Sequence, residues 1–184
     1  MDVKALYPSV PRNEAREAAR KALERRTEIN IESETILEMM DFVLNNNNFE
    51  FNKNNYMQTE GTAIGSKLGR NYACTYMGEW ENELLNNSEK KPIIFLRYID
   101  DIWGIWQHGE SELKKFHKKA NEINENIKVE LRSSTKEIEF LDLLLKIENK
   151  KLITDLFEKK QIVMHIYTIT HHIQSMSKTH YPTV

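Results

Sequence analysis

Two adjacent carboxylates, Asp100 and Asp101, lie between two apolar segments rich in β-branched and aromatic residues, 93–99 and 102–106. Segments of this composition are typical of strands, and a polar pair between them predicts the tight turn of a hairpin. Two neighbouring carboxylates on one turn repel each other, whereas a divalent cation such as Mg²⁺ removes that repulsion and leaves coordination positions for a phosphate ligand. The alternative is an ordinary solvated Asp-Asp turn that holds no metal.

Three short segments, taken together, resemble one protein family. The segment 98–101, Tyr-Ile-Asp-Asp, resembles the Tyr-x-Asp-Asp box of reverse transcriptases, which is motif C of their palm. The segment 2–9, Asp-Val-Lys-Ala-Leu-Tyr-Pro-Ser, is similar to motif A, and the segment 61–68, Gly-Thr-Ala-Ile-Gly-Ser-Lys-Leu, is similar to motif B. The three occur in the family's order, and they are most similar to the Penelope-like retroelements, the branch related to telomerase reverse transcriptase. The resemblance covers residues 1–160.

The resemblance implies an RNA-directed DNA polymerase, in which a DNA primer 3′-hydroxyl attacks a deoxynucleoside triphosphate on an RNA template. Two Mg²⁺ ions activate the attacking oxygen and neutralise the leaving one. Carried over to this chain, Asp2 and Asp100 would bridge the metals, Asp101 would complete the cluster, and the backbone carbonyl of Val3 would be a further ligand. A lysine that follows residues 110–126 would donate a proton to the leaving pyrophosphate, and several lysines are candidates for that role.

The same resemblance implies nucleotide and template contacts for Tyr7, Gly61, Thr62, Gly65 and Ser66. Tyr7 stands where the family places an aromatic ring that selects deoxynucleotides, and its alternative role is an ordinary core tyrosine. Gly61 and Gly65 stand where the family's backbone approaches the template base and the incoming nucleotide. The alternative for these glycines is a loop that needs a positive φ, and Ser66 could simply cap the following helix.

The chain departs from the family's pattern at several places. Lys67 and Arg70 replace prolines of the relatives, which removes rigidity from the motif B loop and adds positive charge. No counterpart of the fingers subdomain precedes Asp2, so we expect a fragment whose parent protein also supplies fingers, thumb and a nuclease domain. We expect the palm core at residues 1–160 and a truncated or degraded start of the thumb at residues 161–184.

The expected elements form an α+β pattern, which suits a polymerase palm with a mainly antiparallel sheet and helices packed on one face. Leu68, Tyr72, Tyr76, Trp80 and Leu84 recur every four residues, which predicts a helix that turns this stripe toward the sheet and its glutamates toward solvent. Besides this helix and the hairpin of residues 93–106, we expect helices from Asn13 (as the cap) to about Arg26, from Ser33 to Leu44 and over 110–126, a hairpin over 49–58, and strands at 128–131, 137–147 and 151–157.

Composition indicates an ordinary globular protein of 184 residues with a formal net charge of −2, which is unusual for a nucleic-acid binder. Local basic surfaces could still bind phosphates, or these cations could lie on solvated helix faces balanced by nearby glutamates. No apolar run approaches the roughly 20 residues of a membrane span. With one cysteine, Cys74, we expect a reducing, intracellular setting, and the resemblance implies a nuclear one. The candidate basic residues are Arg12, Arg16, Arg20, Lys21, Arg25, Arg26, Lys114, Lys115, Lys118 and Lys119.

Two other functions are compatible with the sequence. The chain could be a non-catalytic remnant of a decayed element that still binds nucleic acid. It could also be a small structural or partner-binding α+β domain in which the Asp-Asp turn is a coincidence. Carboxylates at Asp2, Asp100 and Asp101 favour the polymerase, whereas the divergent segment after residue 160 favours the remnant.

Overall fold

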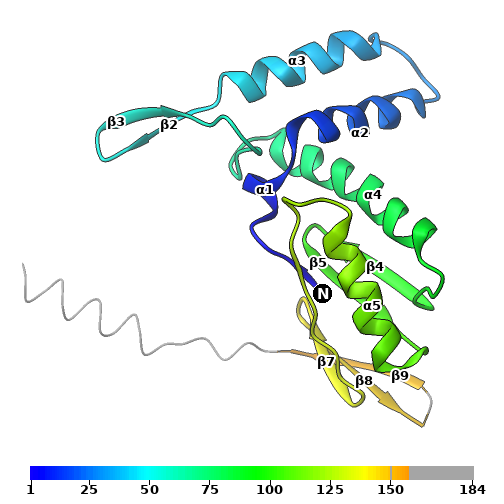
Figure 1. Cartoon of the computed structure of the whole chain (residues 1–184). Coiled ribbons are helices and arrows are strands. Elements are labelled where there is room, and N and C mark those ends of the chain that lie inside the picture. The colour runs from blue at the N-terminus through cyan, green and yellow to red at the C-terminus, as the bar shows by residue number, and fades with distance from the viewer. Residues whose placement is uncertain (150, 158–184) are drawn as a thin grey trace, which may run out of the picture. The chain divides into compact units, whose positions relative to one another are not determined.

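The computed structural model describes residues 1–149 and 151–157 (Figure 1). The chain divides into two compact units after Ser133. The first unit carries all the predicted catalytic and nucleotide-binding residues. The boundary expected after residue 160 lies outside the described residues.

A four-stranded antiparallel sheet organises the first unit, with the order β4-β5-β1-β6. The central strand β1 has only two residues and joins the hairpin of β4 and β5 to β6. Because directly opposite residues of antiparallel strands share a face, the register assigns each side chain to one side of the sheet. The strand bounds are Asp2–Val3 for β1, Ile94–Tyr98 for β4, Asp101–Ile105 for β5 and Val129–Glu130 for β6.

One face of this sheet is apolar and belongs to the core. Val3, Ile102 and Val129 are buried there, and they form one cluster with Trp80 of α4 and Phe116 of α5. Burial of such large apolar side chains is the main favourable term that holds sheet and helices together. The opposite face is the one that carries the carboxylates.

The first unit has five helices, and the predicted helical stretches are confirmed apart from their ends. Helix α2 lies between α3 and α4 (Figure 1). It begins at Arg12 with Pro11 in the cap position, so the expectation that Asn13 caps it is wrong. Pro11 has no N–H to leave unsatisfied, which suits the start of a helix. The bounds are Leu6–Ser9 for α1, Arg12–Glu24 for α2, Ser33–Asn45 for α3, Gly69–Asn87 for α4 and Gly109–Glu122 for α5.

The predicted hairpin before motif B is an isolated two-stranded ribbon, β2 (Asn48–Phe51) and β3 (Asn54–Met57). Its turn residues Asn52 and Lys53 both have positive φ, 51° and 61°. Two positive φ values define a type I′ turn, whose twist matches that of the flanking strands. Asn52 adopts this conformation more readily than most residues because its side chain tolerates the left-handed region.

The second unit contains a three-stranded antiparallel sheet with the order β7-β8-β9. The expectation of one continuous strand over 137–147 is wrong, because the chain turns at Leu141 and Asp142. Leu141 has a φ of 54°, which no strand interior allows. The bounds are Glu137–Phe140 for β7, Leu143–Glu148 for β8 and Lys151–Leu156 for β9. No helix in the described part of the chain is long and apolar enough to cross a membrane.

The stripe predicted along α4 is buried, but the expectation that its glutamates face solvent is only partly correct. Tyr72, Tyr76, Trp80 and Leu84 are all buried. Of the glutamates, Glu83 is exposed, whereas Glu79 and Glu81 are half-buried. Glu79 accepts hydrogen bonds from Lys21 and Arg25, and Glu81 accepts one from Arg97 at 3.1 Å. These ion pairs connect α4 to α2 and to β4.

Replacing Trp80 by Ala should lower the free energy of unfolding by about 3–5 kcal/mol, because it opens a cavity in the core cluster. Trp80→Phe should cost less, since it keeps an aromatic ring and removes an indole N–H that has no partner among the described residues. Urea-induced unfolding followed by circular dichroism measures both changes. Equal, small losses for the two variants would contradict the buried position of Trp80.

The ion pair of Glu79 should make stability depend on pH. Its hydrogen bond with Arg25 is the main cause that lowers the pKa of Glu79. A carboxyl group whose native pKa is depressed adds stability above its ordinary pKa, and this stability is lost as pH falls through the native pKa. Glu79→Gln should therefore be less stable at neutral pH, by about 1 kcal/mol or less because water screens the exposed cations.

The difference between wild type and Glu79→Gln should shrink as the solution is acidified below the ordinary glutamate pKa. Thermal unfolding from pH 7 down to acid measures this trend. The exposed Glu83 serves as the matched control, since it lies on the same helix, and Glu83→Gln should change stability little at any pH. A Glu79→Gln difference that grows on acidification would be the wrong sign for this ion pair.

Candidate active site

Asp2 and Asp101 are direct cross-strand partners, with their side chains on the same face of the sheet. The flanking hydrogen bonds run from the N–H of Val3 to the carbonyl of Asp100 (3.1 Å) and from the N–H of Ile102 to the carbonyl of Met1 (2.8 Å). Asp2 and Asp101 therefore form the pair that is not hydrogen-bonded, in which the Cα atoms approach to about 4.5 Å and the side chains lie closest. The structure thus brings together two carboxylates that the sequence separates by almost a hundred residues.

A third carboxylate, Glu130, lies on the other side of Asp2, because β1 also pairs Asp2 with Glu130. Tyr98 pairs with Asp101 on the far side, so one row across the sheet reads Tyr98, Asp101, Asp2 and Glu130. Glu130 was not among the predicted site residues, because only the register between β1 and β6 places it beside Asp2. Glu130 forms a salt bridge of 2.5 Å with Lys4.

Burial and the neighbouring carboxylates change the proton affinity of Asp2. The pKa of Asp2 is raised, first by burial and then by the negative charges of Asp101, Asp100 and Glu130. Among the described residues, however, no three acidic, histidine or cysteine side chains are gathered into a ready metal cage. The sheet thus places these carboxylates at neighbouring positions, but their side chains do not converge on one point.

The turn between β4 and β5 is not centred on the two aspartates, as the sequence predicted. Its central residues are Ile99 and Asp100, and Asp101 is the first residue of β5. Ile99 has a φ of 59°, and a positive φ at the first central position alone is the mark of a type II′ turn, which normally has glycine there. For a β-branched residue this conformation costs about 1–3 kcal/mol, and such strain persists where the surroundings enforce it.

Arg97 is one of the groups that enforce this turn. Its guanidinium donates to the carbonyl of Ile99 at 3.1 Å and to the carboxylate of Glu81 at 3.1 Å. Both side chains of this ion pair are mostly shielded from water, which makes the pair firmer than an ordinary surface pair. The position of Asp100 is thereby coupled to helix α4.

Gly61 packs the segment that resembles motif B against the segment that resembles motif A. It has a φ of 62°, and a Cβ atom added there would lie 2.5 Å from the carbonyl oxygens of Tyr7 and Pro8. The next N–H, that of Thr62, donates to the Tyr7 carbonyl at 2.9 Å. Both the conformation and this close approach require glycine, so the backbone of Tyr7 and Pro8 lies directly on the loop. The Tyr7 side chain is half-buried against the core cluster, and its contact with a nucleotide stays a prediction.

Gly65 contrasts with Gly61, because nothing in the described fold requires glycine at this position. No atom lies within 4 Å of a Cβ added there, and its φ is not in the left-handed region. Glycine without a structural reason is typical of a surface that a ligand approaches closely. Close approach by a nucleotide therefore stays the prediction for Gly65.

The other two predicted residues of motif B serve the loop itself. The Thr62 side chain is buried, with 2% of the residue exposed, so it does not reach the surface. The Ser66 hydroxyl accepts the N–H of Leu68 at 3.2 Å, one residue before α4 begins at Gly69. Ser66 thus closes a turn in front of the helix instead of capping the helix itself. Ligand contacts of Thr62 and Ser66 remain predictions.

Arg70, two residues after the segment that resembles motif B, contacts the segment that resembles motif C. The Arg70 guanidinium carbon lies 5.8 Å from the centre of the Tyr98 ring, within the range of a cation–π interaction. Tyr98 is next to the strained turn, and Arg70 is in the first turn of α4. Arg70 thus connects the start of α4 to the turn region of β4 and β5.

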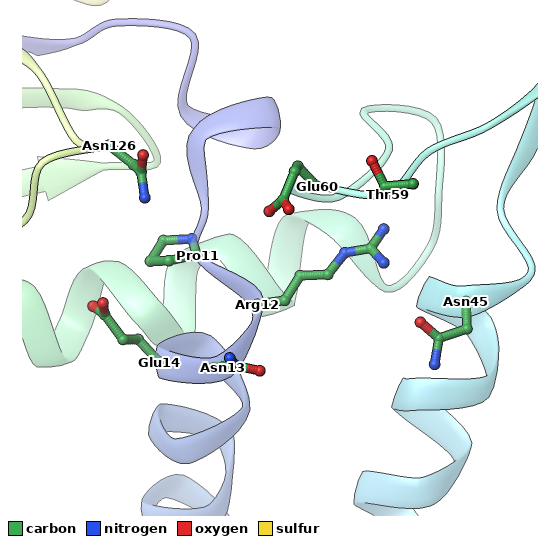
Figure 2. Close-up of a pocket in the computed structure, with 8 residues that line it drawn as sticks. All are labelled: Pro11, Arg12, Asn13, Glu14, Asn45, Thr59, Glu60 and Asn126. Carbon is green, nitrogen blue, oxygen red and sulfur yellow. The ribbon is translucent and has the colours of Figure 1, made fainter.

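A hollow of about 400 Å³ lies beside the motif B loop, but it contains none of the predicted site residues. Figure 2 shows Arg12 extending from the start of α2 toward the loop that carries Thr59 and Glu60. Arg12 donates to the carbonyls of Gly61 (2.9 Å) and Gln58 (2.8 Å), so it fastens the loop to α2. The hollow is lined by Pro11, Arg12, Asn13, Glu14, Asn45, Thr59, Glu60 and Asn126.

The basic residues that could have bound phosphates are used within the fold. Arg16 pairs with Glu34 and Asp41 at 2.8 Å each, and the other candidates of α2 and α5 also have partners. Most of these cations therefore lie beside acids of the same fold, as the alternative of balanced helix faces predicted. The remaining pairs are Arg20 with Glu17 and Glu34, Lys21 and Arg25 with Glu79, Lys114 with Glu110, Lys115 with Glu112 and Lys118 with Glu122, whereas Arg12, Arg26 and Lys119 donate to carbonyls.

No protein-family model, curated protein or solved structure matches this chain. What the site can do therefore follows from its own geometry. That geometry consists of a row of carboxylates on one sheet face, a strained turn beside them and a glycine loop attached to the start of the chain.

The two glycines of motif B should respond differently to the same substitution. Gly61→Ala should lower the free energy of unfolding by more than about 1–2 kcal/mol, because it combines a left-handed φ with a steric clash. Gly65→Ala should stay within about 0.5 kcal/mol of wild type, because its Cβ meets open space. Chemical denaturation measures both, and equal losses would contradict the contrast between the two positions.

Proposed function

We propose that this chain contains the palm of an RNA-directed DNA polymerase related to the Penelope-like reverse transcriptases. One observation carries the proposal: the segment that resembles motif A contacts the segments that resemble motifs B and C, and Arg70, two residues after the motif B segment, contacts the motif C segment. Asp2 pairs with Asp101, Thr62 donates to Tyr7, and Arg70 lies over Tyr98. A coincidental Asp-Asp turn gives no reason for three distant segments to meet at one place.

The donor chemistry at this place fits Mg²⁺. Asp2, Asp100 and Asp101 offer carboxylate oxygens, and the Val3 carbonyl offers a further hard oxygen ligand. Burial, and after it repulsion by Asp101, Asp100 and Glu130, raises the pKa of Asp2, and a divalent cation bound there would relieve that repulsion. When bound, two such ions stabilise the attacking and leaving oxygens of an in-line phosphoryl displacement.

Other residues of the chain would position the substrates. Tyr7 would lie below the sugar of the deoxynucleotide, and the Gly65 backbone would approach the base or template. Lys128 is the lysine we favour as proton donor to the leaving pyrophosphate. It is exposed, and its carbonyl accepts the N–H of Lys4 at 2.8 Å directly beside the pairing of β1 with β6. It is also two residues before Glu130, so strand alternation puts it on the carboxylate face.

The decisive test is primer extension by this domain joined to the fingers and thumb of a Penelope-like reverse transcriptase. Asp100→Asn removes one negative metal ligand and preserves side-chain size. Extension of a primed RNA template with deoxynucleotides and Mg²⁺ should fall by orders of magnitude, with little loss of template affinity. The exposed Asp142 has no assigned role, so Asp142→Asn is the matched control and should extend like the unmodified chimera.

The remaining outcomes distinguish the proposal from its alternatives. Tyr7→Ala should keep part of the deoxynucleotide extension and admit ribonucleotides. If Asp100→Asn extends as well as the unmodified chimera, the carboxylates are not catalytic. Binding of RNA without extension by any chimera would favour a non-catalytic remnant, and absence of both would favour a structural domain.

A further inference from the structure

The ribbon of β2 and β3 places its aromatic side chains on one exposed face. Phe49 pairs with Tyr56 and Phe51 pairs with Asn54, so strand alternation puts these four residues on the same side. Phe49, Phe51 and Tyr56 are 52%, 68% and 45% exposed. We call this side, with Phe49, Phe51 and Tyr56, the aromatic face. Three rings left in water on a small ribbon are costly unless something covers them.

The rings are already arranged for stacking. The centroids of Phe49 and Tyr56 lie 5.6 Å apart, and their planes are inclined by only 20°. In Figure 1 the ribbon extends away from the helices of its unit. An extended platform of nearly parallel rings is a surface on which the bases of a single nucleic-acid strand stack, because every base has a π face.

The charges of the ribbon also favour nucleic acid. Its one carboxylate, Glu50, pairs with Asn55 and therefore lies on the opposite face. Lys53 stands at the turn, next to Asn52 and Asn54. A strand on the aromatic face would thus meet rings, an amide and a cation, and it would avoid the carboxylate that repels phosphates.

Hydrogen bonds connect the base of the ribbon to the loop that carries Gly61 and Gly65. The N–H of Gln58 donates to the Asn47 carbonyl at 3.0 Å, and the Asn47 amide donates to the Gln58 side chain at 2.8 Å. Arg12 donates to the carbonyls of both Gln58 and Gly61. A strand held on the ribbon would therefore be held at a fixed position relative to the loop that carries Gly61 and Gly65.

We propose that the aromatic face stacks unpaired bases of a single-stranded nucleic acid, which under the proposed function is the RNA template before it is copied. The identity of the strand as template rests on that proposed function. The stacking itself depends only on the ribbon, so it can be measured without any polymerase activity.

The test measures binding of the full chain to fluorescein-labelled oligouridylate of about 15 nucleotides by fluorescence anisotropy. Phe49→Ala and Tyr56→Ala should each weaken binding about tenfold, since each removes a ring on which a base stacks. Met57→Ala is the matched control, because Met57 is an equally exposed apolar residue on the opposite face of the same ribbon. Its affinity should equal that of wild type.

A second variant guards against loss of the ribbon structure. Phe49→Trp keeps a stacking ring, so affinity should be retained, and the fluorescence of the new indole should be quenched when oligouridylate binds. The same length of oligodeoxythymidylate shows whether the platform distinguishes RNA from DNA, which stacking alone does not require. Binding is measured without deoxynucleotides or polymerase activity, so failure of the catalytic proposal leaves this result unaffected.

Three results would overturn the inference. Equal weakening of binding by Phe49→Ala and Met57→Ala would mean that binding requires a folded ribbon but no stacking on its rings. Unchanged affinity in Phe49→Ala and Tyr56→Ala would exclude stacking on these rings. Dissociation of a dimer by the ring substitutions in analytical ultracentrifugation, with nucleic-acid affinity unchanged, would assign the aromatic face to contact with a second copy of the chain.

Discussion

The site depends on the register of one two-residue strand. β1 lies between β5 and β6, and it fixes Asp2 beside Asp101 and Glu130 by backbone pairing on both sides. A shift of one residue would turn Asp2 into the core and Val3 onto the carboxylate face. The register is held because Val3 is almost fully buried among apolar side chains, where a carboxylate would be very costly. The burial of one valine thus decides where the carboxylates stand.

Helix α4 connects the remaining parts of the site. Its first turn carries Arg70, which contacts Tyr98, and its middle carries Glu81, which holds Arg97 against the strained turn at Ile99. The loop in front of the helix is attached to Tyr7 through Thr62. The strain at Ile99 can persist because contacts from a rigid helix and from the sheet oppose its relaxation. The candidate active site is therefore a set of short segments held by one long helix.

Local patterns predicted most of the elements but few of the contacts. The four-residue spacing of Tyr72, Tyr76, Trp80 and Leu84 predicted α4, because the buried residues of a helix recur at a regular spacing along the sequence. The turn at Ile99 was misplaced and the turn at Leu141 was not predicted, since turn chemistry gives no reason to expect a positive φ at either residue. Glu130 was missed because its place beside Asp2 comes from pairing between the two ends of the unit. Asp2 and Asp101 were predicted to share one site only because their segments resemble motifs A and C.

The internal pairing of the cations on α2 and α5 has a consequence for how the protein would meet nucleic acid. Proteins with free basic surfaces attract nucleic acid over long distances, which accelerates encounter well above the neutral rate. Here Arg16, Arg20 and Lys114 already face carboxylates, so the field they project into solvent is small. The association rate of a nucleic-acid strand with this domain would be that of diffusion without electrostatic steering. Residence time, set by short-range contacts, would then determine most of the affinity.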